Sequence, residues 1–145
     1  VYPLLPIFRL LGTGYDEMHL YSRMENGVDI YTKGVIRYSK AVCSFKLGLG
    51  VKTEGNLVIS GTKGYIYVPA PWWLTSFFEV RYEDQRLNKK YFYNFDGDGL
   101  RYEIQEFITM IVTKRISSYK LRRRESLTTI RLIEMFNKKE NYHEL

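Results

Sequence analysis

The hairpin Ile59-Ser-Gly-Thr-Lys-Gly-Tyr-Ile66 decides the fold of this chain. Apolar residues alternate on both sides of Gly61-Thr-Lys-Gly64, and so short a link between neighbouring strands requires antiparallel pairing. Asn26-Gly27 and Ser39-Lys40 are links of the same kind. The chain is therefore predicted to form a large, mostly antiparallel sheet from seven alternating segments: Glu17 to Met24, Val28 to Tyr38, Ala41 to Leu47, Leu57 to Ser60, Tyr65 to Val68, Phe77 to Tyr82 and Lys90 to Phe95.

Three segments show helical periodicity. The first, Leu4 to Leu11, stops at Gly12-Thr-Gly14, and two more, about Leu100 to Lys114 and Arg124 to Lys138, close the chain without βαβ alternation. The pattern predicts an α+β fold with the helices on one face of the sheet. We expect the two closing helices to cover that face with Ile104, Phe107, Ile108, Ile111, Leu127, Ile130 and Ile133.

Length and composition bound the class of protein. The 145 residues, 45% of them apolar, suit one domain over residues 1–145 with a full core. The single cysteine, Cys43, excludes a disulfide scaffold within the chain and favours the reducing cytoplasm. The apolar start of the chain is interrupted by Pro3, Pro6 and Arg9, so neither a signal peptide nor a membrane helix is expected.

The net charge of +6 raises the question of nucleic-acid binding. The densest basic run, Lys120-Leu-Arg-Arg-Arg124, is short and precedes a predicted helix. Proteins that bind single strands interleave basic residues with exposed aromatic ones, but here the aromatic residues fall in the strands. Nucleic acid is therefore an unexpected partner, and the run is interpreted as a solvated surface or a contact with another domain.

A dinucleotide-binding loop is not found in the sequence. Such a loop needs Gly-x-Gly-x-x-Gly between a strand and a helix, under the pyrophosphate. The nearest candidate, Gly48-Leu-Gly50-Val-Lys-Thr53, has Thr at the third glycine position and leads towards a strand. It is interpreted as a connection between strands, so we expect the chain alone to bind neither NAD nor NADP.

Metal sites are also not expected from the sequence. His19 and His143 are the only histidines, and neither has a nearby sequence partner of the metal-ligand kind. Asp96-Gly-Asp-Gly99 resembles the start of a calcium loop, but Leu100 stands where the next oxygen ligand belongs. A turn and helix cap is the preferred interpretation of that run.

Two pairs of side chains have alternative interpretations. Glu103 and Glu106 share a helix face and could act as acid and base, or they could contact another domain. Trp72 and Trp73 follow the rigid segment Pro69-Ala-Pro71 and could stack on a sugar, but packing in the core or at an interface is favoured.

Gly97-Asp-Gly-Leu-Arg-Tyr-Glu-Ile-Gln-Glu-Phe107 opens a predicted helix downstream of the hairpin, and Val1-Tyr-Pro precedes the first helix. In this order and spacing, the three elements resemble the C-terminal domain of the Gfo/Idh/MocA oxidoreductases, the glucose-fructose oxidoreductase and inositol dehydrogenase family. The resemblance spans nearly the whole chain. It implies the substrate-side and oligomerisation domain of an enzyme that uses NAD or NADP on a sugar or polyol, with the N-terminal dinucleotide-binding domain and its lysine outside this sequence.

The resemblance places one catalytic residue, Tyr2. In the family, a His or Tyr faces the nicotinamide just after an Asp-x-Gly turn, and Tyr2 stands at that position. A phenol suits hydride transfer at a carbinol because the oxygen must lose or gain a proton as the hydride moves. The alternative is that Tyr2 only packs at the start of the helix.

Aromatic residues predict a partner surface. In Tyr65-Ile-Tyr-Val68, Ile66 and Val68 point to one face of the sheet and the two tyrosines to the other. An exposed aromatic face is larger than the apolar patch that a monomer usually leaves in water. We therefore expect a homo-oligomer through Tyr65, Tyr67, Tyr91 and Tyr93, as the resemblance also implies. The alternative is a face that is merely decorated with tyrosine hydroxyls.

A second class of function stays open. The chain could be a non-catalytic interaction or dimerisation module, attached to another enzyme such as a nucleotidylyltransferase. The presence or absence of the family's lysine and aspartate upstream of Val1 would distinguish the two functions.

Overall fold

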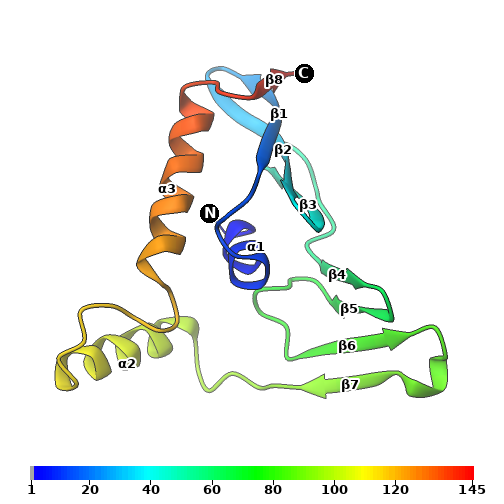
Figure 1. Cartoon of the computed structure of the whole chain (residues 1–145), viewed down its shortest axis with the longest axis vertical. Helices are drawn as coiled ribbons and strands as arrows, with labels where there is room; N and C mark the ends of the chain where they lie inside the picture. Colours follow the sequence, from blue (N-terminus) through cyan, green and yellow to red (C-terminus); the bar gives the residue numbers. More distant parts are fainter. Residues whose placement is uncertain (1) are drawn as a thin grey trace. The chain divides into compact units, whose positions relative to one another are not determined.

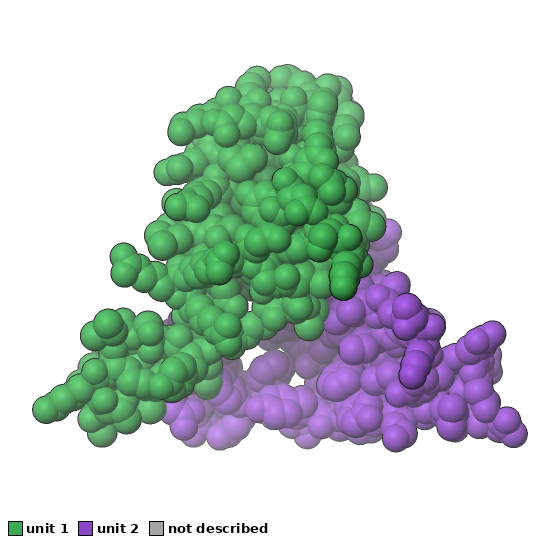
Figure 2. All heavy atoms as spheres, in the orientation of Figure 1, with its two compact units in different colours: residues 1–53, 106–145 green, residues 54–105 purple. Residues whose placement is uncertain are grey.

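The computed structural model describes residues 2–145, which fold into helices and two separate β-sheets (Figure 1). The chain divides into two compact units, residues 1–53 with 106–145 and residues 54–105 (Figure 2). Each unit contains one four-stranded sheet. The prediction of a single domain over residues 1–145 stays a prediction.

The first unit contains the longer strands. Its sheet has the order β3-β2-β1-β8, in which β8 runs parallel to β1 and the other pairs are antiparallel. Asn26 and Gly27 link β1 to β2 with φ values of 51° and 78°, a conformation in which glycine and asparagine are favoured. The elements are α1 (Leu4–Leu11), β1 (Glu17–Glu25), β2 (Val28–Tyr38), β3 (Ala41–Gly48), α3 (Arg123–Asn137) and β8 (Tyr142–Glu144).

The core of the first unit lies between one face of its sheet and two helices. Figure 1 shows α1 and α3 on the same side of β1 and β2, and their apolar side chains meet there. Gly34 of β2 lies directly beneath the Phe45 ring of β3, where a Cβ atom would collide with that ring. The buried apolar residues are Leu4, Phe8, Met18, Leu20, Ile36, Tyr38 and Leu132.

The second unit is an antiparallel meander with the order β4-β5-β6-β7. None of its described residues is fully buried, so this sheet has no core of its own within the described chain. The helix α2 (Gly99–Val112) begins in the second unit and ends in the first. The other elements are β4 (Leu57–Gly61), β5 (Gly64–Val68), β6 (Phe77–Tyr82), the 3-10 helix η1 (Gln85–Leu87) and β7 (Lys89–Phe92).

The predicted α+β class and the mostly antiparallel pairing are confirmed. All seven predicted strands are present within a few residues of their expected bounds. They form two sheets instead of one large sheet, because residues 49–56 between β3 and β4 make no ladder and contain two further glycines. The sequence pattern also did not predict β8, whose three residues are too few to show alternation.

The expected covering faces of α2 and α3 were wrong. In α2, Ile104, Phe107, Ile108 and Ile111 are each 50% to 64% exposed, and no residue of this helix is buried. In α3, the buried side is formed by Glu125, Thr128, Thr129 and Leu132, whereas Leu127, Ile130 and Ile133 are exposed. Glu125 and Thr129 tolerate burial because their side chains form hydrogen bonds within the protein, as Thr129 Oγ1 does to the Glu125 carbonyl at 2.9 Å.

No helix in the described part of the chain is long and apolar enough to cross a membrane.

Candidate functional site

Tyr2 lies immediately before α1, with its side chain 71% exposed. Pro3 stands at the N-cap with φ −67°, so the backbone is already helical where Tyr2 enters it. Two side chains of α1, Leu4 and Phe8, are buried against the sheet. The predicted catalytic phenol is therefore exposed to solvent just before a short helix that is anchored in the core by Leu4 and Phe8.

An ion pair fixes α1 to α3. Arg9 Nη1 of α1 donates to Glu125 Oε1 at 3.2 Å, and Arg9 Nη2 donates to the Tyr119 carbonyl at 2.9 Å. Glu125 is only 7% exposed, and its other oxygen accepts the Arg122 backbone N–H at 2.7 Å. Sequence reasoning missed this carboxylate, although a glutamate three residues after a helix N-cap is a known capping signal.

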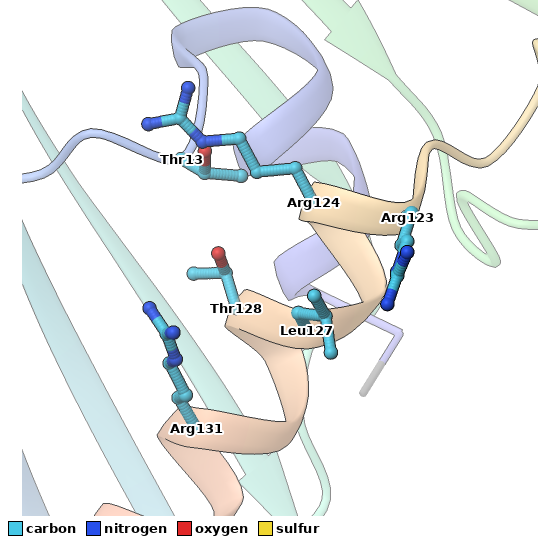
Figure 3. Close-up of a pocket in the computed structure, with 6 residues that line it drawn as sticks. All are labelled: Thr13, Arg123, Arg124, Leu127, Thr128 and Arg131. Atoms are coloured by element: carbon cyan, nitrogen blue, oxygen red, sulfur yellow. The ribbon is translucent and has the colours of Figure 1, made fainter.

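A hollow of ≈ 400 Å³ lies beside the first turns of α3 (Figure 3). Arg124 extends towards Thr13 in this view, whereas Arg123 points to the other side of the helix. The lining residues include three arginines and no acidic residue, so the hollow favours an anion over a cation. The lining residues are Thr13, Arg123, Arg124, Leu127, Thr128 and Arg131.

The Gly48–Gly50 loop is bonded to its own sheet. The backbone N–H groups of Leu49 and Gly50 both donate to the Ile30 carbonyl, at 2.9 and 3.0 Å. A Cβ atom on Gly48 would lie 2.8 Å from the Val51 carbonyl oxygen. The loop's glycines therefore serve local packing, and its N–H groups do not point into a phosphate cradle.

The acidic candidates have structural partners. Glu106 accepts from Ser118 Oγ at 2.8 Å and from Arg115 Nη1 at 3.4 Å. The hydrogen bond from Ser118 and the nearby Arg115 lower the pKa of the Glu106 carboxyl, which makes it a poor general acid at neutral pH. At the start of α2, Asp98 Oδ1 accepts the Leu100 N–H at 3.0 Å, which confirms the predicted helix cap.

Tyr65 and Tyr67 of β5 share one face of the second sheet. Register places them opposite Arg81 and Glu79 of β6, so all four side chains point to the same side. Arg81 Nη1 donates to Tyr65 Oη at 3.2 Å, and its guanidinium lies 4.8 Å from the Tyr67 ring centroid. Arg81 also pairs with Glu79 at 2.6 Å. This face is thus an ordered network of rings and charges.

Tyr91 lies on the opposite face from Tyr65 and Tyr67, contrary to the predicted grouping. It pairs with Phe78 and stacks on its ring at 5.0 Å, and Phe78 shares its face with Val80, which pairs with Ile66. Tyr93 lies beyond the end of β7 and packs edge to face against Phe95 at 6.0 Å. The grouping failed because alternation along one strand does not fix which of its faces aligns with the next strand.

The likeness of this chain to known proteins lies in its fold. No protein-family model matches the sequence, and no curated protein matches it significantly. Among solved structures, KijD10 from Actinomadura kijaniata, a 3-ketoreductase in complex with NADP and TDP-benzene, matches 99% of this chain with TM-score 0.79 and 12% identity. A presumed oxidoreductase from Klebsiella pneumoniae matches 93% of this chain with TM-score 0.64 and 12% identity.

These matches cover 44% of each solved chain, so this chain spans less than half the length of its structural neighbours. At such low identity, the likeness shows a common fold. The chain therefore has the fold of one part of these larger oxidoreductases.

Proposed function

We propose that this chain is the substrate-side and oligomerisation domain of a cytoplasmic NAD(P)-dependent oxidoreductase that acts on a sugar or polyol. The observation that supports the proposal most strongly is the match of 99% of the chain to 44% of KijD10, a ketoreductase solved with NADP. The sequence resemblance to the Gfo/Idh/MocA C-terminal domain points to the same class. The single, half-buried Cys43 agrees with a reducing compartment.

The cofactor belongs to another part of the parent protein in this proposal. When bound, a nicotinamide takes up or delivers the hydride. The Gly48–Gly50 loop does not fit a dinucleotide, because its N–H groups already bond to Ile30. The residues of this chain would instead bind and orient the substrate beside a dinucleotide-binding domain, which the much greater length of the structural neighbours leaves room for.

Tyr2 is the proposed acid–base group. In oxidation, the carbinol oxygen passes its proton to the Tyr2 oxygen as the carbon loses the hydride, and in reduction both steps reverse. A phenol ionises near pH ~10 in water, so this step needs a cation beside it, and the resembled family provides a lysine. The exposed position of Tyr2 before α1 is compatible with contact to such a neighbouring domain.

Tyr2→Phe in the parent enzyme tests this role. We expect turnover to fall about 10²- to 10⁴-fold, the usual effect of losing a general acid or base, with little change in cofactor affinity. Tyr119→Phe is a matched control, because Tyr119 is 74% exposed and its ring keeps its contact with Arg115 without the hydroxyl. Unchanged turnover in Tyr2→Phe would leave Tyr2 as a packing residue.

The parent is further proposed to be a homo-oligomer through the Tyr65 and Tyr67 face. The second sheet has no fully buried residue in the described chain, so its apolar side chains gain stability only when a further surface covers them. Phe77 and Phe92 lie on the same face, opposite each other in β6 and β7. Burial between two copies would cover these rings, on a face where Arg81 and Glu79 are already paired with each other.

Tyr67→Glu tests the interface because two-fold pairing introduces the charge twice near one axis. We expect the mass from light scattering to fall from a dimer to a monomer. Tyr91→Glu is the control, since Tyr91 lies on the opposite face, and it should leave the dimer intact. A dimer in both variants, or a monomeric wild type, would count against this interface.

A non-catalytic interaction module remains the second candidate function. Its supporting observation is that the described chain offers an ordered aromatic face but no phosphate cradle at Gly48–Gly50. The two candidate functions are distinguished by an activity assay on the parent protein. If the chain belongs to a non-catalytic protein, no NAD- or NADP-dependent turnover of any sugar or polyol is expected.

A further inference from the structure

The only two histidines of the chain meet on the outer face of the first sheet. His19 of β1 lies between the buried Met18 and Leu20, so it points away from the core. The parallel pairing of β8 with β1 sets His143 opposite Tyr21 on the same face. His19 Nδ1 and His143 Nε2 are 3.3 Å apart. A separation of 124 residues hid this pair from sequence reasoning.

A carboxylate fixes the orientation of His19. Its Nε2 lies 2.7 Å from Glu17 Oε1, and Glu17 Oε2 accepts from Arg37 Nε at 3.1 Å. A carboxylate only accepts, so Nε2 of the neutral ring carries the hydrogen and Nδ1 presents a lone pair towards His143. The Tyr21 ring stacks on His143 at 4.8 Å and restrains the second imidazole.

We propose that His19 Nδ1 and His143 Nε2 together bind a divalent transition-metal ion. Two imidazoles on a tetrahedral ion such as Zn²⁺, with metal–nitrogen bonds of 2.0–2.1 Å, have their nitrogens about 3.3 Å apart, and neighbouring positions on a tetragonal Cu²⁺ ion require the two rings to approach by about 0.5 Å more. The hydrogen on His143 Nε2 moves to Nδ1 through solvent, so that the neutral ring donates its Nε2 lone pair. Glu17 then takes the place of the carboxylate that commonly supports a metal-bound histidine from its far side.

The ligand set defines the type of ion. Imidazole nitrogen suits copper, nickel and zinc, and calcium and magnesium prefer oxygen. No group of three or more ligating side chains is arranged for a metal in residues 2–145, so water fills the remaining positions. The site is therefore a two-histidine clamp that follows the order Cu²⁺ above Ni²⁺, with Zn²⁺ below Cu²⁺.

The clamp would join the end of the chain to the sheet. β8 has only three residues, and the flanking backbone bonds are Leu20 N to Asn141 O and Leu145 N to Ser22 O, both 2.9 Å. A metal bridging β1 and β8 would add a tie that the unfolded chain cannot make at the same affinity. Binding to the folded state should therefore raise the unfolding midpoint.

The test uses the 145-residue chain without a histidine tag, with Cys43→Ser as background to remove the only thiol. Calorimetry and electron paramagnetic resonance with Cu²⁺ should show one site with two imidazole nitrogens. Because the chain has no other histidine, His19→Gln and His143→Gln should each abolish the two-nitrogen signal. Zn²⁺ should raise the thermal midpoint of the wild type and leave that of His143→Gln unchanged.

Two glutamate variants distinguish the support that Glu17 gives to His19 from a general effect of negative charge on metal binding. Glu17→Gln should weaken Cu²⁺ binding about 10-fold or more, the usual effect of losing an outer partner of a ligand. Glu25→Gln, on the same strand and paired with Arg23, should bind as the wild type does. A one-nitrogen signal in the wild type, equal binding in His143→Gln, or no saturable binding at millimolar Cu²⁺ would overturn the proposal.

Discussion

Replacing Glu125 should weaken the first unit more than replacing any exposed acid of α3. Glu125 is 7% exposed, and its carboxylate accepts hydrogen bonds from two groups, the Arg9 guanidinium at 3.2 Å and the Arg122 N–H at 2.7 Å. It also stands in the first turn of α3, where a negative charge is favoured by the helix dipole. One residue thus caps α3 and binds α1.

The magnitude follows from these contacts. Hydrogen bonds to charged groups contribute about 1.5–3 kcal/mol each, and an acid in the first turn contributes about 0.3–1 kcal/mol. Glu125→Gln keeps one acceptor oxygen and loses the charge, so we expect a loss of about 2 kcal/mol. Glu125→Ala loses both bonds, but Arg9 is 44% exposed and can be hydrated, so we expect about 3 kcal/mol.

Chemical denaturation with two signals is the assay. Circular dichroism at 222 nm follows the helices, and α1 and α3 belong to the first unit, whereas Trp72 and Trp73 belong to the second. Glu125→Gln should lower the dichroism midpoint, and any smaller shift in tryptophan fluorescence measures the coupling between units. Glu134→Gln, an exposed acid near the other end of α3, is the control and should stay within about 0.5 kcal/mol of wild type. Equal effects of the two variants would refute the proposed role of Glu125 in capping α3 and binding α1.

Two further predictions concern the core. Leu132→Ala should lower the free energy of unfolding, measured with denaturant, by about 2–5 kcal/mol, and Ile133→Ala should lower it by less than about 1 kcal/mol. The reason is that Leu132 is 3% exposed and Ile133 is 41% exposed. The reverse order would support the core face that was predicted from the sequence. Burial raises the pKa of Tyr38 to about 12, so its stabilising effect is present below pH ~10 and is lost as the pH rises through about 12. Tyr38→Phe should lower the free energy of unfolding by about 1 kcal/mol at neutral pH, because the hydrogen bond to the Gly12 carbonyl is lost. The variant should also show a smaller fall in melting temperature at alkaline pH. An unchanged fall would contradict the assignment of this pH dependence to Tyr38.

The strands could be predicted from the sequence because alternation and tight links are local signals. The Asn26-Gly27 turn and the Gly61–Gly64 link each determine the pairing of two adjacent strands. The break between β3 and β4 is a different kind of feature. Whether the consecutive strands β3 and β4 pair depends on the path of the longer link, residues 49–56, for which periodicity has no signal.

Helix faces were harder to predict than helix positions. Periodicity in α3 favours Leu127, Ile130 and Ile133 as the core side, but the helix buries Thr128, Thr129 and Leu132. Glu125 determines which side of the helix faces the core, because its bonds to Arg9 and Arg122 fix the rotation of α3 about its own axis. A hydrophobicity pattern cannot represent a carboxylate that is buried because it is paired.

Long-range placement explains the remaining differences in the candidate sites. His19 and His143 meet only because β8 returns to β1, and Tyr91 separates from Tyr65 and Tyr67 only once the register of β5, β6 and β7 is known. The residue types were visible in the sequence. Their distances depended on pairings between distant segments.

The support of Tyr2 links the stability of the first unit to the proposed chemistry. An eight-residue helix such as α1 is not stable alone in water, so its position depends on Leu4 and Phe8 in the core and on Arg9 bound to Glu125. Tyr2 is separated from this helix only by Pro3, and it is mostly exposed, so its own packing does little to fix its position. A catalytic group displaced by about 1 Å can lose about 10²-fold in rate. It follows that, if Tyr2 transfers the proton, the half-buried ion pair between α1 and α3 contributes to turnover without touching the substrate, by fixing the helix that follows Tyr2.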